Sequence, residues 1–233
     1  MKPEAFTEHL QTTLGRRLKA VVLYGSAASD DYIPGKSDYN LLVVCEQWTT
    51  RELDAVRAPT AKWTAAGNPP PLCFTPERLF NATDVFPMEM LDILENHRVL
   101  HGEDPLAGIA VDKSHLRHQV EFELRSKLLK LRQAYLALAR PEKELPRLLD
   151  DSLSTFQAVF RGALRLFTDE APANKPDAVR RLARRLDLDL SVFEELHALK
   201  SGKPSAGGNT VERFDRYLAA IETVLDRIDA KSA

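Results

Sequence analysis

Two short segments in the first fifth of the chain carry residue types that could bind a phosphate and a metal ion. Gly25 and Ser26 follow the apolar run 20–24, and Asp38 and Asn40 open a second apolar run. Glycine lets a phosphate approach the backbone closely, and free N–H groups at the start of a helix attract its negative charge. The Ser26 hydroxyl adds a donor. These residues predict a strand that ends in a phosphate-binding turn.

The second segment has the spacing of a metal-binding strand. Asp38 and Asn40 are two residues apart, so on a strand they project from the same face. Mg²⁺ prefers oxygen ligands, usually one or two carboxylates together with substrate phosphates. A carboxylate strand beside a phosphate-binding turn can hold a Mg-bound nucleoside triphosphate for in-line transfer. Lys36 is a further candidate for a phosphate contact, with a solvated loop lysine as the alternative.

Together the two segments resemble the nucleotidyltransferase superfamily with the polymerase-β-like fold. Its members include aminoglycoside adenylyltransferases and minimal nucleotidyltransferases. Gly25-Ser26 matches the Gly-Ser element, and the segment from Ser37 to Val43 matches the Ser-Asp-x-Asp-Leu element, except that Asn40 stands in place of the second aspartate. The resemblance is specific over residues 20–45 and looser to about 105. It implies that Gly25, Ser26, Lys36 and Ser37 contact the nucleotide, and that Asp38 and Asn40 bind Mg²⁺.

The same resemblance implies a third acid on a later strand. Val85–Ile93 is expected to be that strand, with Pro87 confining it to an edge or a bulge. Glu89 is the first choice for the third metal ligand or catalytic base, and Asp92 is the second. Because they are three residues apart, only one of them could reach the site from a regular strand. A solvated charge at a sheet edge is the alternative for Glu89.

Asn40 leaves more than one functional outcome open. An amide keeps an oxygen for coordination but lacks the negative charge of a carboxylate and cannot act as a base. Three outcomes stay open: an enzyme that works with one well-held ion, compensation by Asp30 or Asp31, or nucleotide binding without turnover. For Asp30 and Asp31 the alternative is a solvated turn.

The chain changes character after about residue 110. The expected organisation is a nucleotidyltransferase-like α/β domain over residues 1–110 and a helical bundle over 111–233, which makes the fold class α+β with a small mixed sheet. Long apolar stripes at helical spacing, such as Leu116 to Leu138 and Leu145 to Phe167, predict the helices of the bundle. Thr210 is expected to cap the last helix. Four arginines, Arg180, Arg181, Arg184 and Arg185, are interpreted as a solvated helix face, with binding of an acidic partner or a tRNA-like substrate as the alternative.

Composition excludes several classes of protein. The 233 residues carry a formal net charge of −2 and a sequence pI near 6.3, which argues against a dedicated nucleic-acid-binding protein. No apolar run approaches the roughly 20 residues of a membrane span, and no signal peptide is evident, so a cytoplasmic protein is expected. Cys45 and Cys73 are expected to be buried free thiols.

The function expected from these observations is transfer of a nucleoside monophosphate, AMP from Mg-ATP, to a hydroxyl of a small molecule or protein. The alternative is a catalytically impaired nucleotide-binding or regulatory module, such as an antitoxin-like partner protein. The acceptor is unknown, and the sequence leaves a homodimer and a complex with a partner protein open.

Overall fold

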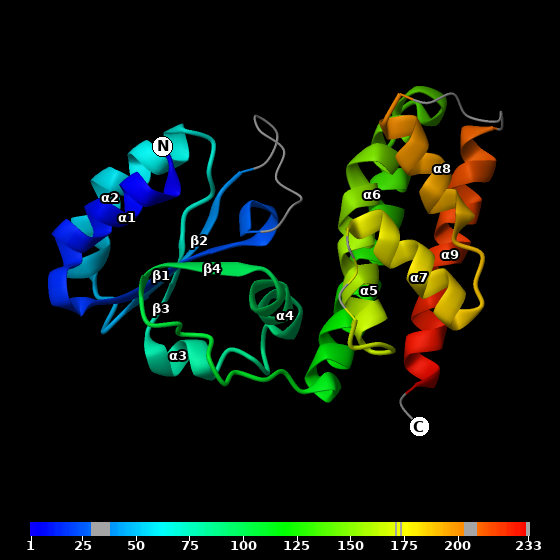
Figure 1. Ribbon diagram of the computed structural model, residues 1–233. Helices are drawn as coiled ribbons and strands as arrows, with labels where there is room; N and C mark the ends of the chain where they lie inside the picture. Colours follow the sequence, from blue (N-terminus) through cyan, green and yellow to red (C-terminus); the bar gives the residue numbers. More distant parts are fainter. Residues whose placement is uncertain (29–37, 171, 173, 203–208, 232–233) are drawn as a thin grey trace. The chain divides into compact units, whose positions relative to one another are not determined.

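The chain divides into two compact units, Met1–Asp112 and Lys113–Ala233. The computed structural model describes residues 1–28, 38–170, 172, 174–202 and 209–231. The first unit is a sheet with helices on both faces, and the second contains only helices among its described residues (Figure 1). The α+β fold class expected from the sequence is confirmed.

The sheet of the first unit has four strands in the order β3-β2-β1-β4. The central strand β1 pairs antiparallel with both β2 and β4, and the short edge strand β3 pairs parallel with β2. The sheet is therefore mixed, as expected. In chain order the elements are α1 (Pro3–Leu14), a 3₁₀ turn η1 (Gly15–Arg17), β1 (Leu18–Tyr24), a 3₁₀ turn η2 (Gly25–Ala28), β2 (Asn40–Cys45), α2 (Thr50–Ala65), β3 (Leu72–Phe74), α3 (Pro76–Phe80), α4 (Pro87–Glu95) and β4 (His97–Gly102).

Alternation along β1 from Ala20 onward and along β2 builds a core on each face of the sheet. Val21 and Leu23 point to one face and pack with apolar side chains of α1 and α2, such as Phe6 and Trp63. Ala20, Val22, Leu42 and Val44 point to the other face and pack with α3 and α4. Both faces of these strands are buried because helices cover both sides, as Figure 1 shows. This explains why β1 and β2 read as continuous apolar runs.

A buried carboxylate fixes the start of α2. Thr49 caps the helix, and Glu52 completes a capping box by accepting hydrogen bonds from the Thr49 backbone and hydroxyl. Glu52 is fully buried, and its other oxygen pairs with Arg17 at 2.5 Å. The hydrogen bond from the Thr49 hydroxyl is the main reason that the pKa of Glu52 falls to about 2, and Arg17 lowers it further.

One expected strand is a helix. Residues 87–95 form α4, so the prediction of a strand over Val85–Ile93 is wrong. Pro87 occupies the first helical position, where its missing N–H costs nothing, and Met90 and Ile93 follow at helical spacing into the core. The strand that completes the sheet is β4, which pairs with β1.

Smaller corrections concern a cap and a thiol. The residue that caps the last helix is Asn209, whose side chain accepts from the Val211 N–H, and not Thr210. Both cysteines are free, as expected, and Cys45 is buried in the sheet. Cys73 is exposed, however, because β3 is a three-residue edge strand. Among the described residues no helix has the length and apolar character to cross a membrane.

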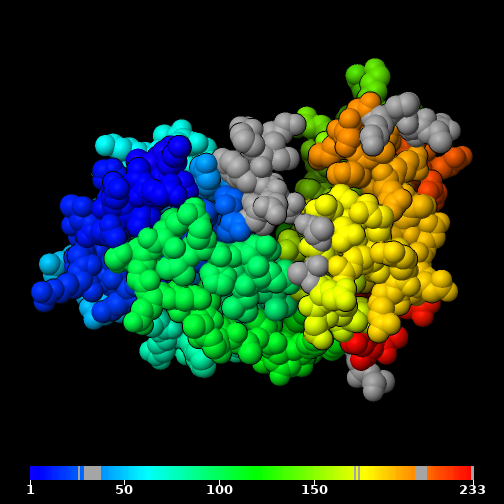
Figure 2. Space-filling model, in the orientation of Figure 1, coloured from blue at the N-terminus to red at the C-terminus, as the bar shows by residue number. Residues whose placement is uncertain are grey.

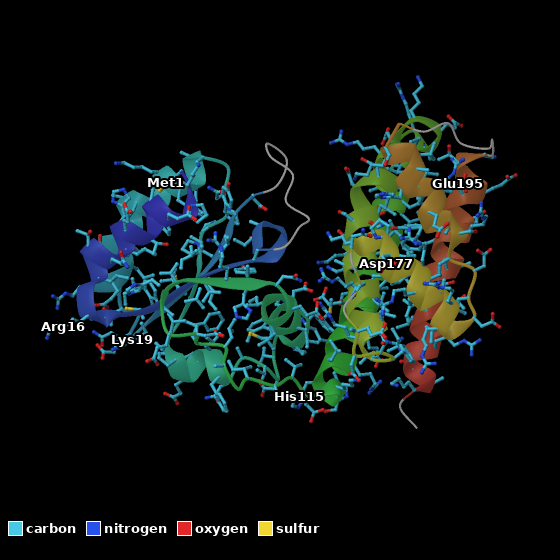
Figure 3. All side chains as sticks on the ribbon, in the orientation of Figure 1. Met1, Arg16, Lys19, His115, Asp177 and Glu195 are labelled. Carbon is cyan, nitrogen blue, oxygen red and sulfur yellow. The ribbon has the colours of Figure 1, made fainter. Side chains whose placement is uncertain are left out.

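The second unit packs its helices around aromatic side chains. Phe193 lies 4.8 Å from both Phe160 and Tyr217 between ring centroids. Glu195, labelled in Figure 3, pairs with Arg213 and Arg216. The helix α7 lies on the face of the unit that Figure 2 shows. The helices described are α5 (Lys113–Leu136), α6 (Pro141–Arg165), α7 (Lys175–Leu186), α8 (Ser191–Lys200) and α9 (Thr210–Ala230).

Candidate functional site

The end of the β1–β2 ladder gathers three of the predicted site residues. Tyr24, the last residue of β1, pairs with Asn40, the first residue of β2. Gly25 therefore follows β1 at the point where Asp38 precedes β2. The Asn40 amide nitrogen lies 3.4 Å from Asp38 Oδ1, and a Cβ on Gly25 would lie 3.6 Å from the same nitrogen. Gly25, Asp38 and Asn40 are called the Gly25–Asn40 site below.

Gly25 has a constrained backbone. Its φ of +77° lies in the left-handed region that favours glycine, which explains why glycine ends this strand. Its N–H donates to the Asn96 carbonyl at 3.2 Å. That N–H is therefore already used, and the following turn is a four-residue 3₁₀ helix, not the start of a long helix. A phosphate bound here would take its backbone donors from residues after Gly25.

Tyr24 is a site neighbour that the sequence did not single out. Its ring packs against the core on the α3–α4 face of the sheet. Burial, and to a smaller extent the nearby Asp38 carboxylate, raises the pKa of the Tyr24 phenol to about 12. The phenol is therefore neutral at any physiological pH, and it forms a fixed, half-buried wall beside Asp38.

His97, the first residue of β4, lies at the same end of the sheet, next to β1 on the side away from β2. It pairs with Tyr24 across the β1–β4 ladder. Its Nδ1 lies 3.1 Å from the Ile93 carbonyl, and its Nε2 lies 3.3 Å from Asp104 Oδ2. Both ring nitrogens thus face acceptors, so the ring links the end of α4 to the turn after β4. The sequence pattern did not indicate His97 as a residue of the site.

The two candidates for the third acid lie on α4. Glu89 is exposed and Asp92 is half-buried, and three residues apart on a helix they lie on adjacent turns of one side. The expectation that they face opposite sides depended on a strand and is wrong. Among the described residues, no group of three or more histidine, cysteine, aspartate or glutamate side chains is placed to hold a metal ion. The role of Glu89, with Asp92 as the second choice, stays a prediction.

Several of the predicted site residues are not among the residues that the structure describes. Asp30, Asp31, Lys36 and Ser37 lie outside the described residues, as does the side chain of Ser26. The nucleotide contacts of Ser26, Lys36 and Ser37 stay predictions, as does compensation for Asn40 by Asp30 or Asp31.

The donor set at the Gly25–Asn40 site is compatible with magnesium. One carboxylate, from Asp38, and one amide oxygen, from Asn40, are the kinds of ligand that Mg²⁺ takes from proteins that bind it together with phosphates. The Asn40 amide turns its nitrogen toward Asp38. For both residues to coordinate one ion, this amide must rotate to present its oxygen.

Comparison with known proteins gives a fold. No protein-family model and no curated protein matches the chain. A solved structure does: spectinomycin adenyltransferase AAD(9) from Enterococcus faecialis, crystallised with ATP and spectinomycin, has a TM-score of 0.59 over 96% of each chain. This chain shares the fold of that protein. The two sequences are 11% identical, and the match extends over both units.

Proposed function

We propose that this protein is a nucleotidyltransferase that transfers AMP from Mg-bound ATP to a hydroxyl group of a small molecule or protein. The observation that carries the proposal is the convergence of Gly25, Asp38 and Asn40 at one end of the sheet, in the fold of an adenylyltransferase. The adenylyltransferase with the similar fold was crystallised with ATP and spectinomycin, which supports a nucleotide as one substrate.

The reaction assigns a role to each residue of the site. The acceptor hydroxyl oxygen attacks the α-phosphorus, the bond from that phosphorus to the bridging oxygen breaks, and pyrophosphate leaves with the bonding electrons. The hydroxyl proton passes to a carboxylate, for which Glu89 is the first choice. Magnesium, held by Asp38 and Asn40, would neutralise charge on the phosphates. Catalysis in such a site is mainly positioning and charge stabilisation.

A second candidate function is a nucleotide-binding module without turnover. It is favoured by the hydrogen bond between the Asn40 amide and Asp38, because this contact satisfies part of the carboxylate without a cation. Asn40 also supplies one negative charge fewer than an aspartate would, which weakens the attraction for a divalent ion. In this case ATP binds, but no pyrophosphate forms with any acceptor.

The first experiment is calorimetric titration of the full chain with ATP, with and without Mg²⁺. Mg-dependent binding is expected, with at least about a tenfold loss of affinity in Asp38→Ala, which corresponds to about 1.4 kcal/mol. Asp54→Ala removes an exposed carboxylate from α2, on the other face of the sheet, and serves as the matched control. Equal ATP affinity in the wild type and Asp38→Ala contradicts both candidate functions at this site.

A pyrophosphate-release assay across hydroxyl-bearing acceptors then separates the two candidates. Release that depends on both ATP and an acceptor supports transfer. Tight Mg-dependent ATP binding without release, for wild type and Asn40→Asp alike, supports the binding module.

A further inference from the structure

A solvent-open cavity of about 440 Å³ lies at the surface of the helical unit, between the end of α6 and one side of α7. It is independent of the Gly25–Asn40 site in composition, because all of its lining residues belong to the second unit. This cavity is called the arginine cavity below. Its lining residues are Leu164, Phe167, Thr168, Arg181, Arg184 and Arg185.

The three arginines differ in how they are held. Arg181 is largely buried, with 19% of its side chain exposed, and pairs with Glu170 at 2.9 Å and Asp177 at 3.8 Å. Asp177 is labelled in Figure 3, at the start of α7. Arg184 and Arg185 are exposed, and neither has an acidic partner within the part of the chain that the structure describes. The cavity therefore has two guanidinium groups without an acidic partner among the described residues, beside one that is fixed in place.

The three arginines place like charges close together. Arg181 lies three and four residues before the other two, so the like charges share one side of α7 and repel each other weakly. Their position near the end of α7 gives part of the compensation, because cations stabilise a helix C-terminus. The helix end explains exposed cations, but it does not explain why three of them line one cavity.

The remaining lining adds a hydroxyl donor and an apolar floor. Thr168 Oγ1 accepts the Glu170 N–H at 3.2 Å, which leaves the hydroxyl hydrogen available to a ligand. Leu164 is buried, and Phe167 is half-buried with Lys231 Nζ 4.5 Å from its ring centroid. The lysine adds a further positive charge near this floor.

We propose that the arginine cavity binds the phosphate or pyrophosphate group of a small molecule. Guanidinium groups donate two parallel hydrogen bonds to phosphate oxygens, and these charge-assisted bonds are stronger than neutral ones. Arg184 and Arg185 supply the free charge, Arg181 supplies a fixed donor edge, and Thr168 supplies a hydroxyl. Leu164 and Phe167 form the wall for the uncharged part of the ligand.

The test is a titration of the full chain with sodium pyrophosphate in EDTA at low salt, followed by calorimetry and by the NMR shifts of Phe167 and Thr168. Divalent metal is removed because nucleotide binding at the Gly25–Asn40 site is expected to require it. We expect saturable binding that weakens at least about tenfold in the double variant Arg184→Gln/Arg185→Gln and by less in Arg184→Lys/Arg185→Lys. Arg147→Gln, an exposed arginine on α6, is the matched control and should bind as the wild type does.

Several results overturn the proposal. One is absence of saturable binding up to about 10 mM, a concentration that corresponds to a very weak complex. Another is equal affinity in the wild type and the double glutamine variant. If that variant does not fold, Thr168→Val and the single Arg185→Gln variant replace it, and unchanged affinity in both has the same meaning.

Two further arms identify the source of the phosphate. Binding that survives Asp38→Ala belongs to the arginine cavity, whereas binding lost in Asp38→Ala and kept in the double glutamine variant belongs to the Gly25–Asn40 site and overturns the proposal. Competition by ATP, in the same metal-free buffer, assigns the phosphate to a nucleotide. Competition by a sugar phosphate and not by ATP assigns it to another phosphorylated molecule.

Discussion

Asn40 and Asp38 form a contact that an aspartate at position 40 could not form. The Asn40 amide donates to Asp38 Oδ1 at 3.4 Å, so the pair is electrically compatible without a cation. Two carboxylates at this separation repel each other until a metal ion lies between them. The identity of residue 40 therefore decides whether the side chains at positions 38 and 40 attract or repel each other in the metal-free site.

The first prediction follows from that contact. Asn40→Asp is expected to lower the melting temperature in EDTA and to show a larger stabilisation by Mg²⁺ than the wild type, because the added carboxylate binds the ion more tightly in the folded state. Differential scanning fluorimetry across a magnesium series measures both effects. Asn174→Asp adds the same charge at the exposed N-cap of α7 and should show no magnesium dependence. Identical magnesium responses for wild type and Asn40→Asp would mean that residue 40 does not bind the ion.

The second prediction concerns the acids of α4. If the protein transfers AMP, Glu89→Gln is expected to lower kcat by about 100-fold, because a positioned base contributes on this order, whereas Asp92→Asn should lower it by less than about tenfold. ATP affinity, measured by calorimetry, should change little in Glu89→Gln if the residue acts on the acceptor. The reverse order of the two effects would assign the base to Asp92.

The sequence predicted the site residues that lie close together along the chain, but not those that strand pairing brings to the site from other segments. Asp38 and Asn40 lie together because they are only two residues apart, immediately before and at the start of β2, which a pattern can express. Tyr24, Asn96 and His97 join the site through the β1–β4 register and the bond to Gly25. That register connects segments far apart in sequence, and strand pairing over such a distance depends on packing that a single sequence does not encode as a pattern.

At the scale of elements, Gly102 fixes how closely β4 approaches β1. Its φ is +79°, and a Cβ there would lie 1.9 Å from the Lys19 carbonyl oxygen. Gly102→Ala is expected to destabilise the chain by about 4 kcal/mol or more, because backbone must move. Gly108→Ala is the matched control: its φ is +78°, but nothing lies within 4 Å of its Cβ, so a cost of about 1 kcal/mol is expected. Urea denaturation measures both, and similar costs would show that the clash relaxes.

The buried Glu52 gives the first unit an acid-sensitive element. Its pKa is about 2 in the folded chain and near the ordinary 4.5 when unfolded, so its ionised form stabilises the fold above the unfolded value. This contribution is expected to disappear as the pH falls from about 4.5 to about 2. Urea midpoints over that range should fall less steeply in Glu52→Gln than in the wild type. Glu8→Gln, an exposed residue of α1, should keep the wild-type slope.

The error at α4 has a physical origin. Periodicity distinguishes a helix from a strand poorly over short apolar runs. The helix α4, which contains Glu89, has only nine residues. The family resemblance implies a third acid on a strand, and it therefore favoured a strand over this segment. Pro87 favours either an edge strand or a first helical turn, and packing of Met90 and Ile93 against the sheet decides for the helix.

At the scale of the molecule, each unit has its own core. The first unit buries the two faces of its sheet, and the second buries an aromatic centre between α6, α8 and α9. The segment 113–233 expressed alone is therefore expected to fold as a cooperative helical unit. Circular dichroism with thermal melting measures this. A helical signal without a cooperative transition would show that the second unit needs the first.

The strand order has a consequence during synthesis. The central strand β1 is made early, but its neighbour β4 is the last strand of the unit to be made. Until His97–Gly102 has left the ribosome, one side of β1 has unpaired N–H and C=O groups, and such an open side can pair with another chain. A ribosome-bound chain that ends before β4 should be degraded readily by protease, and one that extends beyond Asp112 should resist. Translation speed between β2 and β4 would then influence how much of the protein reaches its native state.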